Sequence, residues 1–271
     1  MELIGAKEMK TGVSTACFYP LETEKALIKI GEMGVKTAEI FFNSPSELEP
    51  EFIKGLCETS VKYSMKIKSI HPYLTFGETY LFFSEYKRRY NDSLVSFRKH
   101  LSAAQKLGAK FLIIHGSLLP GVISSSEYFE RFRQLIEIGK EYGVTVIQEN
   151  VVRFFSQSPD FLVEMRENLG DDFKMVLDLK QAIRANHSAF EFVEKLRENI
   201  VHVHVSDCRE NSDCLPPGEG VFNFNKLIEQ LNSDGDDIDL IVELYRRNYQ
   251  TESQILDSFN YLNKLITKTA Y

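Results

Sequence analysis

Residues 144–149 read VTVIQE, a short apolar run that ends in a carboxylate. Two later stretches repeat this form, FKMVLD at 173–178 and LIVE at 240–243, and a third, IVHVHV at 200–205, has a histidine next to its end. Apolar, β-branched runs of this length predict strands that are buried on both faces. Longer amphipathic stretches separate them, so strand and helix alternate, which predicts a parallel sheet with right-handed crossovers.

The same alternation extends outward over the chain and predicts eight strand–helix pairs. Glycines at 34, 108 and 143 precede predicted strands, where they suit the left-handed cap that ends a helix. Eight such units close into a barrel. An open doubly wound sheet would carry a glycine-rich phosphate turn after the first strand, where this chain has Phe18-Tyr19-Pro20. We therefore expect an α/β fold, a single (β/α)8 TIM barrel, with one domain over residues 1–271.

The predicted strands are 11–18, 35–41, 66–71, 110–115, 143–149, 173–178, 200–206 and 238–243. The predicted helices are 22–33, 47–63, 82–107, 125–142, 158–168, 180–197, 224–233 and 251–268.

Composition and charge narrow the class of protein. The chain has 32 Lys and Arg against 39 Asp and Glu, a net charge of −7. This balance argues against nucleic acid as a partner, because phosphate binding depends on clustered basic residues. No apolar run reaches the ~18 residues of a membrane-spanning helix, and the first residues, MELIGAKEMK, lack the apolar core of a signal peptide. We expect a cytoplasmic protein that binds neither nucleic acid nor a membrane.

The predicted strands end in side chains that suit a metal ion: Glu149, Asp178, His204 and Glu243. In such barrels the C-terminal strand ends form the active site, so these four side chains are expected to meet. Three carboxylates and one imidazole favour Mn²⁺, Mg²⁺ or Co²⁺ over thiolate-seeking metals. Any one carboxylate alone would be read as a solvated loop residue or a helix cap, and Asp178 in particular could cap the helix that starts near Lys180. The four together favour a metal site.

The remaining histidines divide by position. His71 and His115 end the third and fourth strands, where each could bind substrate or metal or belong to the scaffold. His202 shares a face with His204 and is expected one layer below the barrel mouth. His100 and His187 fall in predicted helices and are expected to face solvent.

Other aromatic and basic residues follow the strands. The aromatic side chains are expected to pack at the barrel rim, with one or two forming an apolar wall of a small-ligand site: Phe18, Tyr19, Phe41, Phe42 and Tyr73. Four basic side chains could bind a phosphate or carboxylate, but solvated surface charge is the expectation for most of them: Lys180, Arg209, Arg246 and Arg247. The longest predicted loop, about 206–223, could cover the site.

With these residues placed, the chain resembles the xylose-isomerase-like TIM barrels, a superfamily of sugar (phosphate) isomerases and epimerases related to endonuclease IV. The resemblance spans about residues 11–268. It rests on the order and spacing of short motifs: FLIIHGS at 111–117, VIQEN at 146–150, VLD at 176–178, HVHVSD at 202–207, PPGEG at 216–220 and IVELY at 241–245.

The resemblance implies a metal-dependent isomerase or epimerase for a sugar or sugar derivative, which acts by proton transfer through an enediolate. It implies one divalent ion, with Mn²⁺ the first expectation and Mg²⁺, Co²⁺ or Zn²⁺ as alternatives. The implied metal ligands are Glu149, Asp178, His204 and Glu243, and the two glutamates are also the implied catalytic acid and base. Substrate contacts are expected from His71, His115, Gln181 and Arg209.

The chain departs from the family pattern at one place. Many members have Asp-x-x-His after the sixth strand, but this chain has Asp178-Leu179-Lys180-Gln181, and an amide cannot relay protons. The same glutamine breaks a ligand pair of the three-zinc endonuclease IV site. A DNA repair enzyme of that kind is therefore a weaker alternative than an inosose-dehydratase-like lyase, and a non-catalytic sugar-binding barrel is a third. A homo-oligomer is a further hypothesis.

Overall fold

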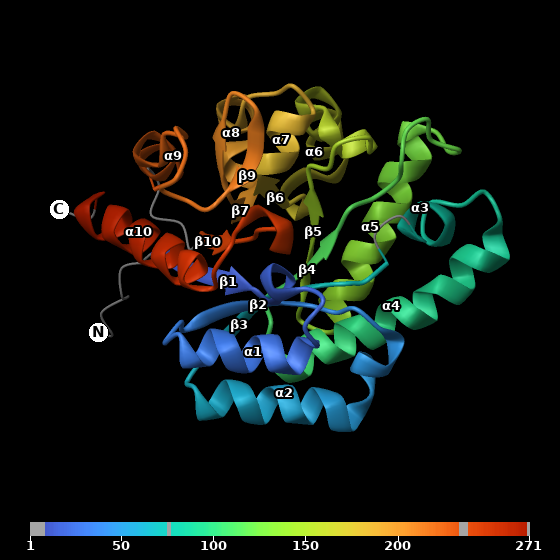
Figure 1. The fold of residues 1–271 in the computed structure, drawn as a ribbon. Helices are drawn as coiled ribbons and strands as arrows, with labels where there is room; N and C mark the ends of the chain where they lie inside the picture. The colour runs from blue at the N-terminus through green and yellow to red at the C-terminus, as the bar shows by residue number, and fades with distance from the viewer. Residues whose placement is uncertain (1–8, 75–76, 233–237, 270–271) are drawn as a thin grey trace, which may run out of the picture.

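Eight parallel strands close into a barrel in the computed structural model, which describes residues 9–74, 77–232 and 238–269. The last barrel strand pairs with the first, so the sheet has no free edge, and the predicted single (β/α)8 barrel is confirmed. Figure 1 shows the helices arranged around the strands. The barrel strands are β1 (Lys10–Ser14), β2 (Thr37–Phe41), β3 (Lys66–His71), β4 (Phe111–Ile114), β5 (Thr145–Glu149), β6 (Met175–Asp178), β7 (Ile200–Val205) and β10 (Asp239–Val242).

Two long predicted helices differ in the structure. The predicted helix 82–107 begins only at Lys87, after a separate short helix that ends at Leu81, and the predicted helix 180–197 breaks near Asn186, whose φ of 59° is left-handed. The first strand is also shorter than predicted, because the Ser14 side chain accepts a hydrogen bond from Ala16 N and begins a 3-10 turn. The helices are α1 (Thr23–Glu32), α2 (Pro50–Lys62), α3 (Gly77–Leu81), α4 (Lys87–Leu107), α5 (Ser125–Glu141), α6 (Pro159–Leu169), α7 (Leu179–Arg184), α8 (Ala189–Leu196), α9 (Phe224–Leu231) and α10 (Ser253–Thr269).

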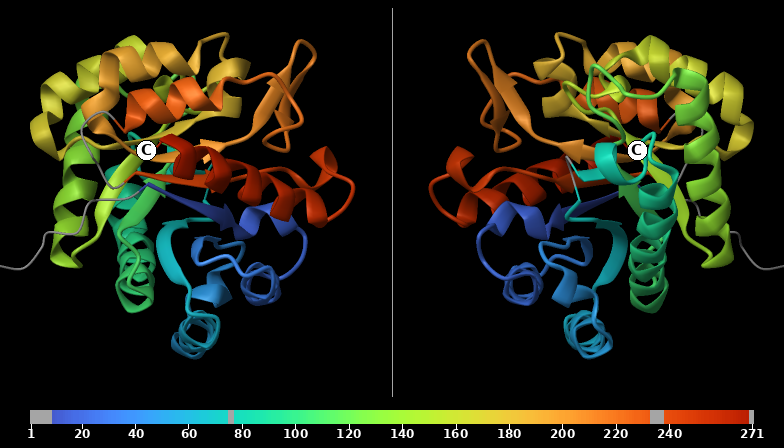
Figure 2. Two further views of the ribbon diagram at one scale, coloured as in Figure 1. Left: turned by 90° about the vertical axis from the view of Figure 1, so that its left-hand side faces the viewer. Right: turned by 90° about the vertical axis from the view of Figure 1, so that its right-hand side faces the viewer.

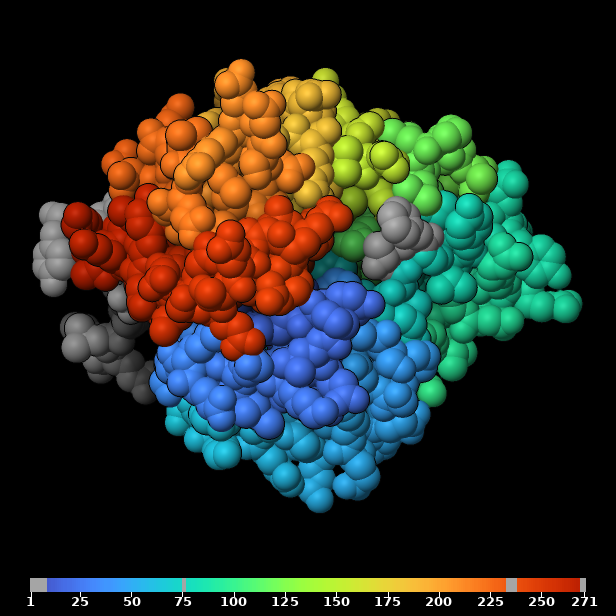
Figure 3. All heavy atoms as spheres, in the orientation of Figure 1, coloured from blue at the N-terminus to red at the C-terminus, as the bar shows by residue number. Residues whose placement is uncertain are grey.

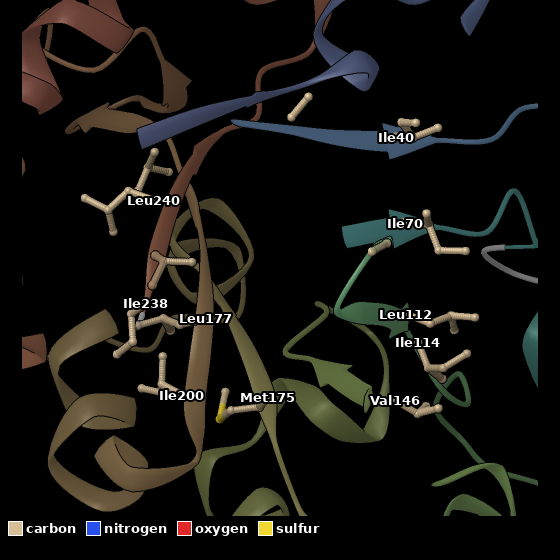
Figure 4. Close-up of a cluster of buried hydrophobic side chains, with 14 of the residues drawn as sticks. Ile40, Ile70, Leu112, Ile114, Val146, Met175, Leu177, Ile200, Ile238 and Leu240 are labelled. Atoms are coloured by element: carbon tan, nitrogen blue, oxygen red, sulfur yellow. The ribbon is translucent and has the colours of Figure 1, made fainter. Parts of the chain in front are cut away.

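The hydrophobic core follows the alternation of side chains along each strand. Leu112 and Ile114 of β4 join the main cluster, which also contains the buried faces of the helices. Figure 4 shows this layer of aliphatic side chains from successive strands. Phe111 and Ile113, the alternate residues of the same strand, form a separate small cluster with residues of β5 and β6. Residues two apart on a strand therefore share one environment, as period-two reasoning predicts.

The glycines that were expected to end helices do so. Gly34, Gly108 and Gly143 have φ values of 79°, 67° and 69°. Residues with a side chain rarely adopt this conformation, so glycine allows the chain to leave each helix and turn toward the next strand.

The long predicted loop after β7 contains a hairpin instead of irregular chain. Strands β8 (Asp207–Arg209) and β9 (Ser212–Leu215) pair antiparallel, and Figure 2 shows the hairpin standing away from the barrel. The Asp207 carboxylate accepts hydrogen bonds from the backbone N–H groups of Gly218, Gly220 and Phe222, each at 2.9 Å. One buried carboxylate thus fixes the return of the chain toward α9.

Two histidines lie elsewhere than predicted. His100, expected at the surface, is fully buried on α4 beside Phe42 and Tyr73. Its Nδ1–H donates to the Ser96 carbonyl, and burial lowers its pKa to about 4. His187, expected on a helix, lies half-buried between α7 and α8.

In the parts of the chain that the structure describes, every helix is too short or too polar to cross a membrane.

Candidate active site

Four side chains from different strands converge at one end of the barrel. Glu149 and Asp178 end β5 and β6, His204 lies in β7 beside Asp178, and Glu243 directly follows β10. The Nδ1 atom of His204 is 3.6 Å from one oxygen of each carboxylate: Glu149 Oε1, Asp178 Oδ2 and Glu243 Oε2. All four potential ligand atoms lie within 4.8 Å of one another. The structure therefore brings together the four residues that the sequence selected as metal ligands.

The His204 ring is held from behind by a residue that sequence reasoning missed. Glu39, buried in the middle of β2, accepts a hydrogen bond from His204 Nε2 at 3.0 Å. The same carboxylate oxygen contacts Ser69 Oγ at 2.7 Å and His202 Nε2 at 3.1 Å. His202 thus lies below the mouth, as predicted. A carboxylate behind the imidazole fixes its orientation and leaves Nδ1 pointed at the other three carboxylates.

The carboxylates around His204 favour a positive charge on its ring. Its Nδ1 atom is buried and has no hydrogen-bond partner among the described residues. Burial alone would lower the pKa of His204, but the negative charges of Glu39 and Glu243 outweigh burial and raise that pKa well above its ordinary value. Either a proton or a metal ion bound to Nδ1 would compensate these negative charges.

His71 and His115 meet Glu149 from the neighbouring strands. Their Nε2 atoms lie 3.3 Å and 3.1 Å from Glu149 Oε2. Burial raises the pKa of Glu149, yet His115 and the hydrogen bonds from the surrounding imidazoles bring it well below the usual value. The result is a buried carboxylate held in its ionised form. His71, His115 and Glu149 also form a second group with metal-compatible geometry.

Lys180 is the second residue that sequence reasoning misjudged. It was expected among solvated surface charges, but it is 2% exposed and its ammonium contacts both Asp178 Oδ2 and Glu243 Oε2. The reason is local. The Asp178 side chain caps α7 by accepting from Gln181 N at 3.0 Å, as its capping interpretation predicted, so the helix starts at once and turns Lys180 inward.

A cavity of ≈ 690 Å³ opens above these residues. Phe41, Val151 and Phe154 supply apolar lining, which matches the predicted apolar wall only at Phe41. The polar lining residues are His71, His115, Glu149, Arg153, Lys180, Gln181, Arg184, Glu243 and Tyr245. In Figure 3 the surface is hollowed between the orange-red C-terminal segment and the blue N-terminal segment, with green and teal atoms at its floor. This volume and mixed lining suit a small-molecule ligand.

The two remaining substrate-contact candidates lie in different places. Gln181 lines the cavity, and its Oε1 accepts a hydrogen bond from Val152 N at 3.3 Å. Arg209 is exposed on the hairpin, where its guanidinium donates to the Glu219 carbonyl, and it is not among the cavity-lining residues. The cavity instead contains Arg184, which pairs with Asp213 of the hairpin.

One further buried acid lies behind the histidines. Glu78 of α3 accepts a hydrogen bond from Gly116 N at 2.7 Å, and burial raises its pKa to about 6. It is fully buried, and nothing in its surface-like sequence context, GETYL, indicated this position. Its charge adds to that of Glu149 in raising the pKa of His115 against the opposing effect of burial.

The geometry agrees with comparisons to known proteins. Residues 27–265 match the family model of the xylose isomerase-like TIM barrels, and the chain belongs to this family. It is 27% identical over 244 residues to the uncharacterized protein MJ1311 of Methanocaldococcus jannaschii, covering 85% of this chain and 82% of that protein. Among solved structures, a D-tagatose 3-epimerase-like protein superposes with a TM-score of 0.80 at 24% identity, covering 97% and 98% of the two chains. The 3-keto-D-glucoside 4-epimerase of E. coli superposes with a TM-score of 0.76 at 18% identity, covering 95% and 100%.

Proposed function

We propose that this protein is a divalent-metal-dependent isomerase or epimerase of a sugar or sugar derivative. The observation that carries the proposal is the position of His204 Nδ1, buried, without a partner among the described residues, and 3.6 Å from each of three carboxylates at the base of a cavity. The names of the two structurally similar epimerases agree with it.

The charges of the site support a divalent ion. On the Nδ1 side of His204, Glu149, Asp178 and Glu243 contribute three negative charges and Lys180 one positive charge, so −3 + 1 leaves −2. One divalent cation would neutralise this balance, whereas a buried excess of two negative charges is costly. Carboxylate oxygens with a single imidazole nitrogen suit Mn²⁺ first, and Mg²⁺, Co²⁺ or Zn²⁺ are alternatives.

Two glutamates are available for proton transfer. A bound divalent ion would polarise the substrate carbonyl and make the adjacent C–H more acidic. Glu149 is kept ionised by its histidines, so its carboxylate is ready to accept that proton. Glu243 directly follows β10, and its proximity to Lys180 and His204 lowers its pKa against the effect of burial. Proton return at the same carbon would give epimerisation, and return at the neighbouring carbon would give isomerisation.

Metal analysis combined with deuterium exchange tests this proposal. The purified protein is analysed for metals, and the metal-loaded protein is then incubated in D₂O with a panel of ketoses and keto sugar acids. We expect about one divalent ion per chain, the number of ions that the four-ligand site holds, and deuterium next to the carbonyl. Product that has lost water would assign the lyase instead. Three zinc ions per chain without deuterium exchange would favour the endonuclease IV-like alternative. Protein that holds no metal and still binds sugars would contradict the proposed enzyme and favour a sugar-binding barrel.

A further inference from the structure

Several of the cavity-lining side chains are hydrogen-bond donors. They are Arg153, Lys180, Gln181 and Arg184, which line the cavity together with the carboxylates Glu149 and Glu243. Three of the four donors belong to α7 and one to the segment after β5. These four residues form a donor wall that adjoins the carboxylates, because the ammonium of Lys180 contacts Glu243 directly.

The two segments of this wall are fastened together. Gln181 Oε1 accepts from Val152 N at 3.3 Å, which joins α7 to the segment that carries Arg153. Arg153 itself adopts a φ of 71°, and its backbone is held on both sides: its N–H donates to Gln157 Oε1 at 2.9 Å and its carbonyl accepts from Leu119 N at 2.7 Å. A left-handed backbone conformation costs free energy for a residue that is not glycine, so these two hydrogen bonds hold Arg153 in place.

The positive charges of the wall differ in how they are neutralised. Lys180 contacts Asp178 and Glu243, and Arg184 forms a two-pronged ion pair with Asp213 through Nε at 2.5 Å and Nη2 at 3.0 Å. The guanidinium of Arg153 has neither an ion pair nor a side-chain hydrogen bond in residues 9–74, 77–232 and 238–269.

The sum of these charges has a consequence for the ligand. The three carboxylates, Lys180 and a divalent ion sum to −3 + 1 + 2, which is zero, and the pair of Arg184 with Asp213 is also neutral. The charge of Arg153 remains. Arg153 is thus the lining cation that has no carboxylate partner among the described residues, and Gln181 lines the same cavity.

We infer that the substrate carries an anionic oxygen group, a carboxylate or a phosphate, which Arg153 binds at the donor wall while the carbonyl end lies at the metal end. This inference rests on the proposed function, because it places the anionic group relative to the reacting carbon. The planar guanidinium can bind two oxygens of either group at once, which a neutral sugar hydroxyl does not offer. Gln181 and Arg184 border the same group.

Calorimetric titration of the metal-loaded protein tests the inference. The probes are neutral ketohexoses, their 6-phosphates and the corresponding keto-uronic acids, each compared with its own neutral parent. At least one charged probe should bind about tenfold tighter than its parent, the size of one charge-assisted hydrogen bond. Preference for the phosphate or for the carboxylate identifies the group. If no charged probe binds better than its parent, including the case in which none binds, the inference is overturned.

Variants of Arg153 separate this site from general electrostatic attraction. Arg153→Gln should lose most of the preference for the charged probe and leave the affinity for the neutral parent unchanged. Arg153→Lys keeps the charge and should retain part of the preference. Arg88→Gln removes an exposed arginine of α4 outside the cavity and should change neither. An equal effect of Arg153→Gln and Arg88→Gln would overturn the inference.

Deuterium exchange keeps the two proposals distinct. Charged probes that bind through Arg153 but never exchange deuterium would leave the anion site standing and contradict the isomerase. Rapid exchange on neutral ketoses that is unaffected by Arg153→Gln, with no preference for charged probes, would support the isomerase and overturn the anion site.

Discussion

The Nε2 atom of His204 lies 3.0 Å from Oε2 of Glu39, on the side of the imidazole opposite the three carboxylates. Neither residue can change without affecting the other, because Glu39 sets both the orientation and the basicity of the ring. This contact lies inside the barrel, and it is the basis of the first prediction.

Glu39→Gln should weaken metal binding while the barrel still folds. The amide keeps the volume of the side chain but loses the charge, so His204 becomes a poorer ligand, and we expect a loss of about 10–100-fold in metal affinity. Competition with a chelating dye measures this loss. Ser69→Ala is the matched control, since Ser69 contacts Glu39 at 2.7 Å without touching the metal end. Equal metal affinity in Glu39→Gln and wild type would contradict the role of Glu39.

Glu149→Gln and Glu243→Gln should each lower kcat at least about 100-fold, the usual contribution of a general acid or base, while sugar binding persists. The change removes one proton acceptor at nearly constant volume. Steady-state kinetics at saturating metal, with calorimetry for sugar binding, make the comparison, and Glu194→Gln on the exposed face of α8 serves as control. A variant that keeps wild-type kcat would eliminate the two-glutamate scheme.

Asp178→Asn should separate metal binding from helix capping. Asparagine caps helices about as well as aspartate, so the hydrogen bond that Asp178 accepts from Gln181 N should survive and the unfolding midpoint should change little. Metal content should fall, because an amide oxygen is a weaker ligand than a carboxylate. Elemental analysis and a thermal melt of the same sample test both halves. Full metal content in this variant would remove Asp178 from the ligand set.

Lys180→Met should make stability depend on metal. The ammonium contacts the same oxygens of Asp178 and Glu243 that face His204, so it both compensates them and competes with a cation. Removing one partner of a buried ion pair costs about 3–5 kcal/mol, which we expect as lost stability in chelator. Excess Mn²⁺ should restore much of it and should bind tighter than to wild type. Weaker Mn²⁺ binding in the variant would show that Lys180 assists the ion instead of competing with it.

His100 should make the protein sensitive to acid. Its pKa of about 4 in the folded protein lies below the ordinary value of 6.5, so between these values the unfolded chain binds more protons. The contribution of His100 is complete above pH 6.5 and is lost as the pH falls toward 4, by about 2 kcal/mol between pH 7 and pH 5. Urea unfolding at both pH values measures it. His100→Gln keeps a donor for the Ser96 carbonyl, and its pH-dependent loss should be smaller by that amount; an identical loss would contradict the assignment.

The barrel and the meeting of four strand-end residues could be predicted because both follow from repetition. Each apolar run carries an ionisable residue at its end or next to it, and parallel strands of a barrel end at the same mouth. Nothing beyond the order of strands and helices was needed to expect Glu149, Asp178, His204 and Glu243 near one another. Their roles as ligands and as acid and base remain predictions.

The positions of the residues that were missed are set by local geometry, which cannot be read from residue type. His100 follows the spacing of Phe97, Leu101 and Ala104, which predicts a buried helix face, but an imidazole was expected to face solvent. Glu39 alternates with apolar neighbours in TAEIF, and this pattern alone does not say which face enters the barrel. The inward position of Lys180 depends on where α7 begins, and helix boundaries are the least predictable feature of an element.

Because Asp178 caps α7, one short segment of the chain carries several functional side chains of the site. Residues 178–184 carry a proposed metal ligand, the ammonium that balances it, and two further donors that line the cavity, all within seven consecutive positions. One continuous segment therefore supplies several functional side chains of the pocket. A graft of these seven residues into a related barrel would carry the proposed ligand, its counter-charge and two donors together, whereas the anion preference assigned to Arg153 would not move with them.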